Sequence, residues 1–234
     1  MSTKQRDWRG ELATDIRWPC PLPPQLRDDF IDMAEPLDLK RLNDGLPGIV
    51  YIRSGCLTGY TFSENMDASL GMLHGHGCWF GIQSIHAIST PGIYEAITPT
   101  ELVLFPKKKV ESWLNRHPEG YQLLFFIAQH IGRILVQTGS NTLLSLSSRI
   151  IYVLLELANK AAPPNDVESR IKITQQTLSH IVGISRPRLN EILHVLSEQG
   201  AIRTERGTIV IRDPAGLKTR LHSFSFQYHD PLTA

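Results

Sequence analysis

The chain has 234 residues, of which 41% are hydrophobic and 20% are charged, and its formal net charge is +1. This composition is that of an ordinary globular protein, and the near-zero charge says little about any partner. The length allows a buried core arranged in one domain or, more in keeping with usual domain sizes, in two.

The start of the chain, MSTKQRDWRGELATDIRW, is charged throughout and has no apolar core of signal-peptide length. The longest purely apolar run, Leu123–Ala128, is too short to cross a bilayer. We therefore expect a cytoplasmic protein with no membrane partner. Its three cysteines, Cys20, Cys56 and Cys78, are widely spaced and odd in number, so they indicate neither a disulfide framework nor a CxxC zinc site. We expect reduced thiols, at least two of them packed as small apolar groups.

After a Pro-rich segment, WPCPLPPQLRDDF, residues 45–106 change in character. Short β-rich runs separated by Gly, Asn or Pro follow one another at intervals of about ten residues. These runs are GIVYIRSG, CLTGYTF, ASLGMLHG, GIYEAIT and ELVLFP. No helical period interrupts them, so the segment predicts an all-β sandwich or barrel.

From Lys107 the pattern becomes helical: KKKVESWLNRHP predicts a short helix stopped by Pro118, and a longer helix runs from Glu119 to about Gly139. The longer helix carries an apolar seam with alternating three- and four-residue steps, while other apolar side chains lie off it. The seam is Leu124, Ile127, Ile131, Ile134 and Thr138, and the others are Leu123, Phe125, Phe126 and Leu135. Such a helix is either a core helix of one domain or, the favoured interpretation, packs on the β domain with one face and on its twin in a homodimer with another.

A strongly amphipathic helix follows in LSLSSRIIYVLLELANKAA, with a Ser cap at Ser145 or Ser147. Its apolar positions are Ile150, Val153, Leu154, Leu157 and Ala158, and the segment PPND ends it.

The segment after Ile171 meets the packing constraints of a helix-turn-helix. With Gln175 as the first position, the small residue of the helix crossing is Ser179 and the left-handed turn residue is Gly183. The apolar positions are Leu178, Val182, Ile184, Leu189 and Ile192. The segment therefore predicts two short helices that cross closely at Ser179.

The neighbouring residues agree with this interpretation. Thr174 can cap the first helix, Ser185 can cap the second, and Pro187 lies in the first turn of the second helix, where a missing N–H costs little. The segment GAIRTERGTIVIRD then predicts a Gly stop and a hairpin with Gly207 in its turn and alternating Ile209 and Ile211. That hairpin is a wing.

The first turn of the second helix would enter the major groove, where Arg can donate two hydrogen bonds to guanine O6 and N7. Arg186 and Arg188 occupy this turn, and its N-terminus favours phosphate. For Arg188 a solvated or phosphate-contacting position is favoured over base reading. Asn190, one turn beyond Arg186, either reaches a base or phosphate or is a solvated polar residue.

The segment ITQQTLSHIVGISRPRLNEILHVLSEQGAIRTERGTIVIRDPAGL resembles the C-terminal DNA-binding domain of the Crp/Fnr superfamily of bacterial transcription regulators. SSRIIYVLLELA resembles the preceding helix of that family, with Arg149 in its Arg position, and IVYIRSGCLTGY and GCWFG resemble its cyclic-nucleotide-binding-type β domain. The resemblance covers most of residues 40–220. It implies that Arg186 reads guanine. It also implies an unusual half-site, because Pro187 replaces the family's base-contacting Glu and Glu191 its later Arg; Glu191 either accepts from cytosine or pairs with a neighbouring Arg.

The sensor departs further from the family. Cyclic-AMP-binding members carry FGE and a later Arg-Ser pair, but here Ile82 follows FG and SIHAISTPGIYEA holds no Arg, so canonical cAMP binding is not expected. An iron–sulfur cluster, which normally needs four Cys, is also disfavoured because only Cys20 lies near the N-terminus. The effector stays unknown.

His74 and His76 form an H-x-H pair that could lie on one side of a strand and bind a metal or haem iron, with His86 as a further ligand. The alternative function is therefore a cupin-like metal-dependent enzyme, or a metal or haem sensor. The carboxylate expected shortly after such a pair is missing from GCWFGIQS, and a Gly-rich turn with two solvated His is favoured.

The sequence thus predicts an α+β protein that is not an enzyme: an N-terminal cyclic-nucleotide-binding-type β-sandwich (jelly roll) in residues 1–112, a long dimerisation helix and hinge in 113–142, and a winged helix-turn-helix in 143–234. The candidate DNA-binding residues are Thr174, Gln175, Ser185, Arg186, Pro187, Arg188, Asn190 and Glu191. Expected partners are double-stranded DNA, read as a pseudo-palindrome by a homodimer, and RNA polymerase as a further candidate.

Overall fold

A computed structural model of the chain describes residues 8–62, 69–85, 93–161 and 169–221. The chain divides into two compact units, each built from several segments: unit 1 is Met1–Ser54, His76–Pro91 and Thr100–Ile131, and unit 2 is Gly55–Gly75, Gly92–Pro99 and Gly132–Ala234. The sequence-based domain borders at residues 112 and 142 stay a prediction. None of the helices in the described ranges is long and apolar enough to cross a membrane.

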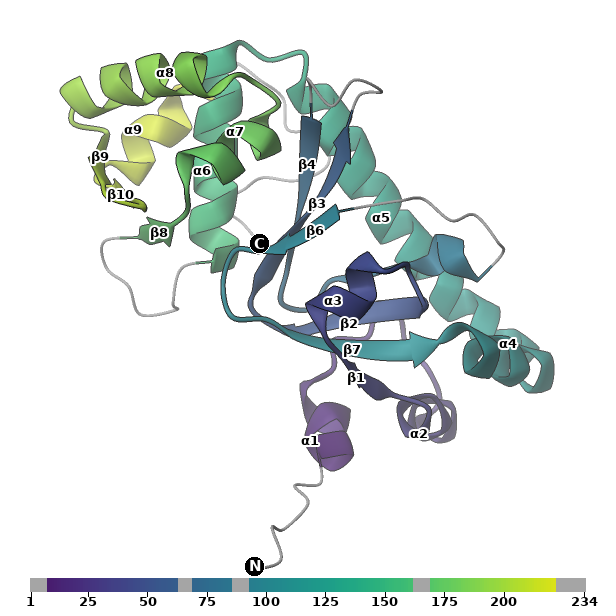
Figure 1. Cartoon of the computed structure of the whole chain (residues 1–234). Coiled ribbons are helices and arrows are strands. Elements are labelled where there is room, and N and C mark those ends of the chain that lie inside the picture. The colour runs from purple at the N-terminus through teal and green to yellow at the C-terminus, as the bar shows by residue number, and fades with distance from the viewer. Residues whose placement is uncertain (1–7, 63–68, 86–92, 162–168, 222–234) are drawn as a thin grey trace, which may run out of the picture. The chain divides into compact units, whose positions relative to one another are not determined.

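Unit 1 contains a four-stranded antiparallel sheet with strand order β1-β7-β2-β5 (Figure 1). Its strands are β1 (Glu35–Leu37), β2 (Gly48–Ser54), β5 (Trp79–Phe80) and β7 (Glu101–Pro106). Its helices are α1 (Trp8–Asp15), α2 (Pro24–Asp32), α3 (Leu39–Asn43) and α4 (Lys107–Arg116), with short 3-10 turns η1 (Ile82–Ser84) and η2 (Pro118–Gly120).

Aromatic side chains form the core of unit 1. Phe30 of α2 stacks on Phe105 of β7 with ring centroids 4.4 Å apart and meets Trp113 of α4 edge-on at 4.9 Å. Tyr51 and Trp79, from neighbouring strands, pack at 4.7 Å. All five side chains are almost fully buried, so this cluster fastens helices α2 and α4 to the sheet.

Unit 2 begins with a three-stranded antiparallel sheet of order β4-β3-β6. Its strands are β3 (Cys56–Phe62), β4 (Ser69–Gly75) and β6 (Ile93–Ala96). These strands, with β2 and β7, correspond to the five β-rich runs of the sequence, so the prediction of strands in residues 45–106 is confirmed. All three cysteine side chains are buried, as expected for small apolar groups, and none of them is part of a disulfide.

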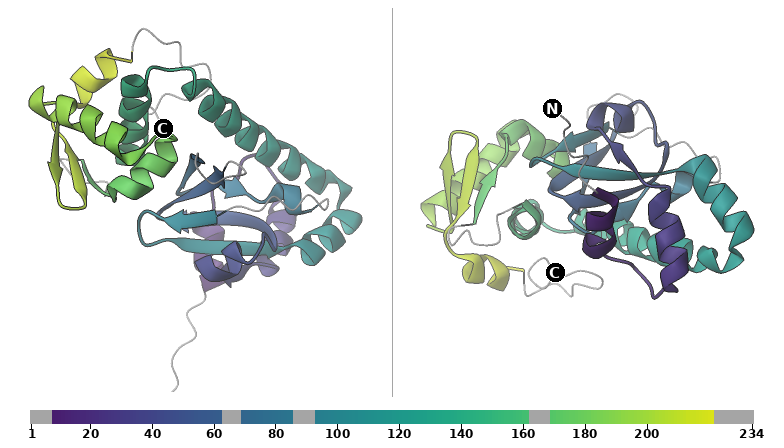
Figure 2. Two further views of the ribbon diagram at one scale, coloured as in Figure 1. Left: turned by 45° about the horizontal axis from the view of Figure 1, so that its top comes forward. Right: turned by 90° about the horizontal axis from the view of Figure 1, so that it is seen from below.

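Helix α5 (Tyr121–Asn141) is one uninterrupted helix of 21 residues, drawn in teal in Figures 1 and 2. The apolar seam expected from the sequence lies on its covered side: Leu124 and Ile127 are buried, and Ile131, Ile134 and Thr138 are half-buried. A neighbouring side of the helix is exposed and also apolar. Its exposed large side chains are Tyr121, Phe125, Leu135 and Val136, which expose 48%, 58%, 51% and 47% of their surface.

The rest of unit 2 is a winged helix-turn-helix, green to yellow in Figure 2. Its helices are α6 (Leu146–Ala161), α7 (Gln175–Val182), α8 (Arg186–Glu198) and α9 (Pro214–Thr219), and its strands β8 (Arg170–Lys172), β9 (Ile202–Glu205) and β10 (Thr208–Ile211) form a sheet of order β8-β10-β9. Ser145 caps α6, since its Oγ accepts a hydrogen bond from the N–H of Ser148 at 3.1 Å. Eight consecutive residues of α6, Ile150–Leu157, are buried, so this helix is the centre of the core.

Candidate DNA-binding site

The joint between α7 and α8 has the predicted construction. Gly183 ends α7 in the left-handed conformation, with φ 75°, and its N–H donates to the oxygen of Ser179 at 2.9 Å. Ser179 is 2% exposed, as a small residue at a close helix crossing should be. Of the five predicted apolar positions, Leu178, Val182 and Leu189 are buried, while Ile184 and Ile192 are half-buried against the same core.

The first turn of α7 is held by a chain of hydrogen bonds. The predicted cap at Thr174 is confirmed: its Oγ1 accepts from the N–H of Thr177 at 3.0 Å. The hydroxyl of Thr177 donates to Glu95 Oε1 of β6 at 2.9 Å, and the two threonine oxygens lie 2.7 Å apart. Because Thr177 gives its proton to the carboxylate, Thr174 is the donor between the two hydroxyls. The capped turn thus has a fixed orientation.

The start of α8 corrects one prediction. Ser185 occupies the N-cap position with an extended backbone, and its main-chain oxygen accepts from the N–H of Leu189, but its side chain makes no capping hydrogen bond. An N-cap side chain accepts from the second or third N–H of the helix; Pro187 at the second position has none, and Ser185 does not use that of Arg188 at the third. The predicted place of Pro187 in the first turn is confirmed.

The exposed face of α8 has fewer free polar groups than the sequence implied. Arg186 is exposed, and its Nε donates to Gln175 Oε1 at 3.4 Å. Arg188 is exposed but forms an ion pair with Glu191 one turn later. In the free protein Glu191 therefore pairs with a neighbouring Arg, and its contact with a base stays a prediction. Asn190 is half-buried, and its Oδ1 is buried with no hydrogen bond to the described residues, so Asn190 is only partly solvated.

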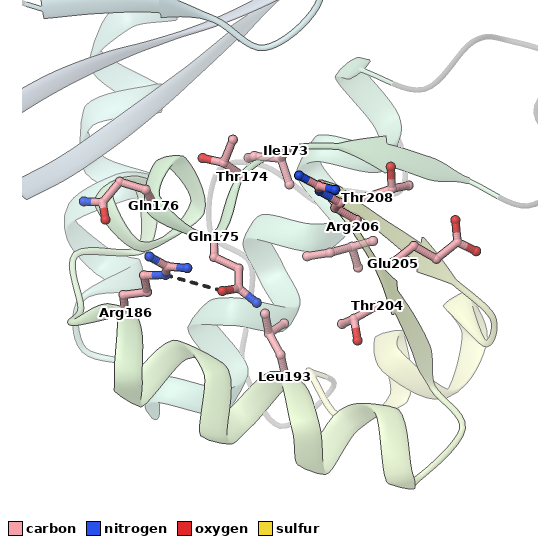
Figure 3. A pocket seen from close by; sticks show the side chains of 12 residues that line it. Ile173, Thr174, Gln175, Gln176, Arg186, Leu193, Thr204, Glu205, Arg206 and Thr208 are labelled. Carbon is pink, nitrogen blue, oxygen red and sulfur yellow. Dashed lines mark hydrogen bonds between the residues drawn. The ribbon is translucent and has the colours of Figure 1, made fainter.

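A groove of about 540 Å³ opens beside these residues (Figure 3). Its walls come from the first turn of α7, from Arg186 and Leu193 of α8, and from the wing residues 204–209. The wing turns at Gly207, φ 71°, as predicted, and the exposed Arg206 precedes it. Sequence reasoning did not select Arg206. The signal was available, because an Arg beside the Gly of a hairpin tip has no core to enter.

The structure does not assemble the alternative histidine site. His74 lies on β4 and is buried, with 5% of its surface exposed. His76 lies beyond the end of β4, and its Nδ1 forms a hydrogen bond with the main-chain oxygen of Arg53 at 2.7 Å. The expectation that both residues lie on one strand is therefore wrong. The expectation of two solvated imidazoles is wrong for His74, which is buried, whereas His76 is exposed as expected. His86 lies outside the described residues. Within the described part of the chain, three or more His, Cys, Asp or Glu side chains do not come together to hold a metal ion.

Known proteins with similar sequences share the helix-turn-helix. Residues 148–220 match the family model of the Crp-like helix-turn-helix domain. The chain is 24% identical over 209 residues to the HTH-type transcriptional regulator Cmr of Mycobacterium tuberculosis, a match that spans 84% of this chain and 82% of that protein. It is 31% identical over 121 residues to the cAMP-activated global transcriptional regulator CRP of Salmonella typhimurium, of which it spans 56%. The similarity to CRP thus covers about half of each protein.

Solved structures show the same fold. A putative Crp/Fnr-family regulator from Eubacterium rectale aligns with 85% of this chain and 94% of its own at a TM-score of 0.65 and 18% identity. A CRP/FNR-family regulator from Thermus thermophilus aligns with 77% and 93% at 0.62 and 25% identity. With the N-terminal cyclic-nucleotide-binding-type β domain and the wing in place, the fold and the site define a DNA-binding transcription regulator rather than an enzyme. Specifically, residues 148–220 are a Crp-like helix-turn-helix domain, and the matches together support a transcription regulator of the Crp/Fnr type.

Proposed function

We propose that the chain acts as a homodimer that reads a pseudo-palindromic DNA site, with Arg186 of each protomer donating to a guanine in the major groove. The single observation that carries this proposal is the position of Arg186: it is exposed and is the first residue of the second helix of a Crp-like helix-turn-helix. In that family type the N-terminal turn of this helix contacts base edges, and two copies about 34 Å apart read successive major grooves.

The exposed side of α5 supports the homodimer. Tyr121, Phe125, Ala128, Gly132, Leu135 and Gly139 follow one another in alternating steps of four and three residues, which is the spacing of a coiled-coil seam. Their small members, Ala128 and Gly132, let a second helix approach closely, while Phe125 and Leu135 supply apolar area. An exposed apolar stripe of this length on a helix is typical of a protein interface. We assign it to a second copy of the chain.

The remaining predicted residues act mainly on the DNA backbone. Thr174 and Gln175 present the N-terminus of α7, whose free N–H groups favour a phosphate. Ser185 and Pro187 shape the entry of α8, and Arg188 is available to DNA only after leaving Glu191. Arg206 at the wing tip adds a positive charge that suits a phosphate. Asn190 and Glu191 therefore contribute less to base reading than Arg186.

We propose that the effector is neither cAMP bound in its usual mode nor an iron–sulfur cluster. Ile82 stands where cAMP-binding members have a carboxylate. The chain contains three cysteines, one fewer than a cluster normally requires. Residues 86–92, which include most of the stretch that would grip a phosphate, lie outside the described residues. We further propose that the regulator works in the cytoplasm and contacts RNA polymerase.

Arg186→Ala tests the proposal. Duplexes selected from a random pool by the unmodified protein provide the specific probe, and a scrambled duplex provides the control. We expect the variant to remain a folded dimer but to lose about 1–3 kcal/mol of discrimination in each half-site, because one bidentate Arg–guanine contact is removed. If the variant discriminates between the selected and the scrambled duplex as well as the unmodified protein does, Arg186 does not read a base.

A further inference from the structure

Gln175 and Arg186 are the first residues of α7 and α8, and their side chains meet across the turn between the two helices (Figure 3). The Nε of Arg186 donates to Oε1 of Gln175 at 3.4 Å. A guanidinium has donors only, so the oxygen of the amide must be the atom that faces it. This hydrogen bond joins residues that are eleven positions apart in the chain, and it therefore links the start of α7 to the start of α8.

This contact uses the one donor of Arg186 that base reading does not need. A bidentate contact with guanine O6 and N7 can be made by the two terminal nitrogens of the guanidinium. Gln175 takes the inner nitrogen, Nε, and leaves both terminal nitrogens to donate outward. The hydrogen bond therefore restrains the side chain without competing for the groups that would touch DNA.

Within the described part of the chain, Gln175 is the side chain that holds Arg186. Pro187, the next residue, has no polar side-chain atom, and Glu191, the acid on the same helix, forms its ion pair with Arg188. Gln176, the neighbour of Gln175, is directed to His180 on its own helix. Arg186 is thus held by a side chain of α7 rather than by one of the recognition helix.

We infer that Gln175 is a positioning residue that sets the specificity of Arg186 for guanine. The inference rests on the proposed function and deepens it by naming what orients the reading side chain. An Arg that is already held in the conformation that reads guanine loses little conformational freedom when it binds guanine, whereas donating to a differently placed acceptor would require breaking its hydrogen bond to Gln175. Gln175 contributes to discrimination through Arg186, not through a base of its own.

A double-mutant cycle tests the inference in the full chain. The probe is the duplex enriched from a random pool by the unmodified protein, together with the same duplex carrying a substitution at the guanine assigned to Arg186. Binding of both is measured for the unmodified protein, Gln175→Ala, Arg186→Ala and the double variant. Gln176→Ala is the matched control, since it removes an exposed amide from the same turn without touching Arg186.

We expect Gln175→Ala to lower the affinity ratio of the two duplexes about three- to tenfold, and to lower it no further when Arg186 is already Ala. Gln175→Glu, which keeps the accepting oxygen, should retain the ratio while weakening both affinities. Equal losses from Gln175→Ala in both backgrounds would make Gln175 an independent contact and overturn the inference. If Arg186→Ala itself leaves the ratio unchanged, the proposed base-reading function fails instead.

Discussion

Arg149 of α6 donates from Nη1 to the main-chain oxygen of Val182, the last residue of α7, at 3.3 Å. The same guanidinium donates from Nε to the oxygen of Asn141 at 3.2 Å and from Nη2 to that of Thr142. One side chain thus donates to three carbonyl groups at or near the ends of two helices, where main-chain oxygens lack the usual helical partner; that of Asn141 also accepts from the N–H of Leu144 at 3.1 Å. Partial burial lowers the pKa of Arg149. Arg149 therefore joins α5, α6 and the helix-turn-helix in unit 2.

Arg149→Met should lower the free energy of unfolding by about 2–3 kcal/mol, because three charge-assisted hydrogen bonds are removed and the carbonyl oxygens of Thr142 and Val182 lose their donor. Urea denaturation followed by circular dichroism measures the change. Arg149→Lys is the control: it keeps the charge but cannot reach three oxygens at once, so it should recover only part of the stability. A Lys variant as stable as the unmodified protein would show that charge alone matters here.

Gly183→Ala and Gly207→Ala separate two costs of adding a methyl group. Both glycines have positive φ, 75° and 71°, so each substitution should cost about 1–2 kcal/mol of backbone strain. At Gly207 the added Cβ meets open space, whereas at Gly183 it would lie 2.6 Å from the oxygen of Ser69 in β4. We therefore expect the larger loss of thermal stability at Gly183. Equal losses for the two variants would mean that the main chain of Ser69 moves aside at no cost.

The helix-turn-helix was largely predictable because its constraints act over short distances along the chain. Ser179, Gly183 and Leu189 lie within eleven residues and have one geometry in which they can pack. The wing, too, is a local hairpin. The two-residue strand β5 was not predictable, since Trp79–Phe80 is defined by pairing with Val50 and Tyr51, about thirty residues earlier. The hydrophobic pattern of a short segment cannot reveal pairing with a strand so far away in the sequence.

The partners of individual side chains could not be predicted from the sequence either. Spacing placed Arg186, Arg188 and Glu191 on one helix, but whether Glu191 faces a base or an Arg depends on side-chain conformation. For α5 the periodicity indicated two apolar sides. Which side is covered depends on neighbours that are distant in sequence, and the structure leaves Phe125 and Leu135 exposed.

The exposed apolar side of α5 predicts the effect of charge on assembly. Phe125→Glu combined with Leu135→Glu should weaken self-association at least about tenfold, because carboxylates cannot be buried unpaired in an apolar seam. Sedimentation velocity over a range of concentrations measures this. Affinity for the selected duplex should fall in parallel, since one helix-turn-helix alone reads only half of the site.

Gln122→Glu is the matched control for the α5 variant, because Gln122 is exposed on the same helix and lies outside the apolar stripe. It should leave both the dimer and the DNA affinity unchanged. A double-Glu variant that is folded and still dimeric at low concentration would mean that α5 does not form the dimer contact.

Arg206 and Arg186 should differ in how salt affects their variants. Arg206 precedes the wing turn and lines the same groove as Arg186, but it belongs to a hairpin tip, where a cation suits a phosphate rather than a base edge. Removing one phosphate-binding cation lowers the slope of log affinity against log salt by about one, so Arg206→Ala should lower it by about two in a homodimer. The order of affinities of the Arg206→Ala variant for different duplex sequences should stay unchanged. Arg186→Ala should instead alter that ranking, and titrations at several salt concentrations on specific and scrambled duplexes measure both effects. If Arg206→Ala changes the sequence ranking but not the salt slope, the wing Arg reads bases and its assignment to phosphate is wrong.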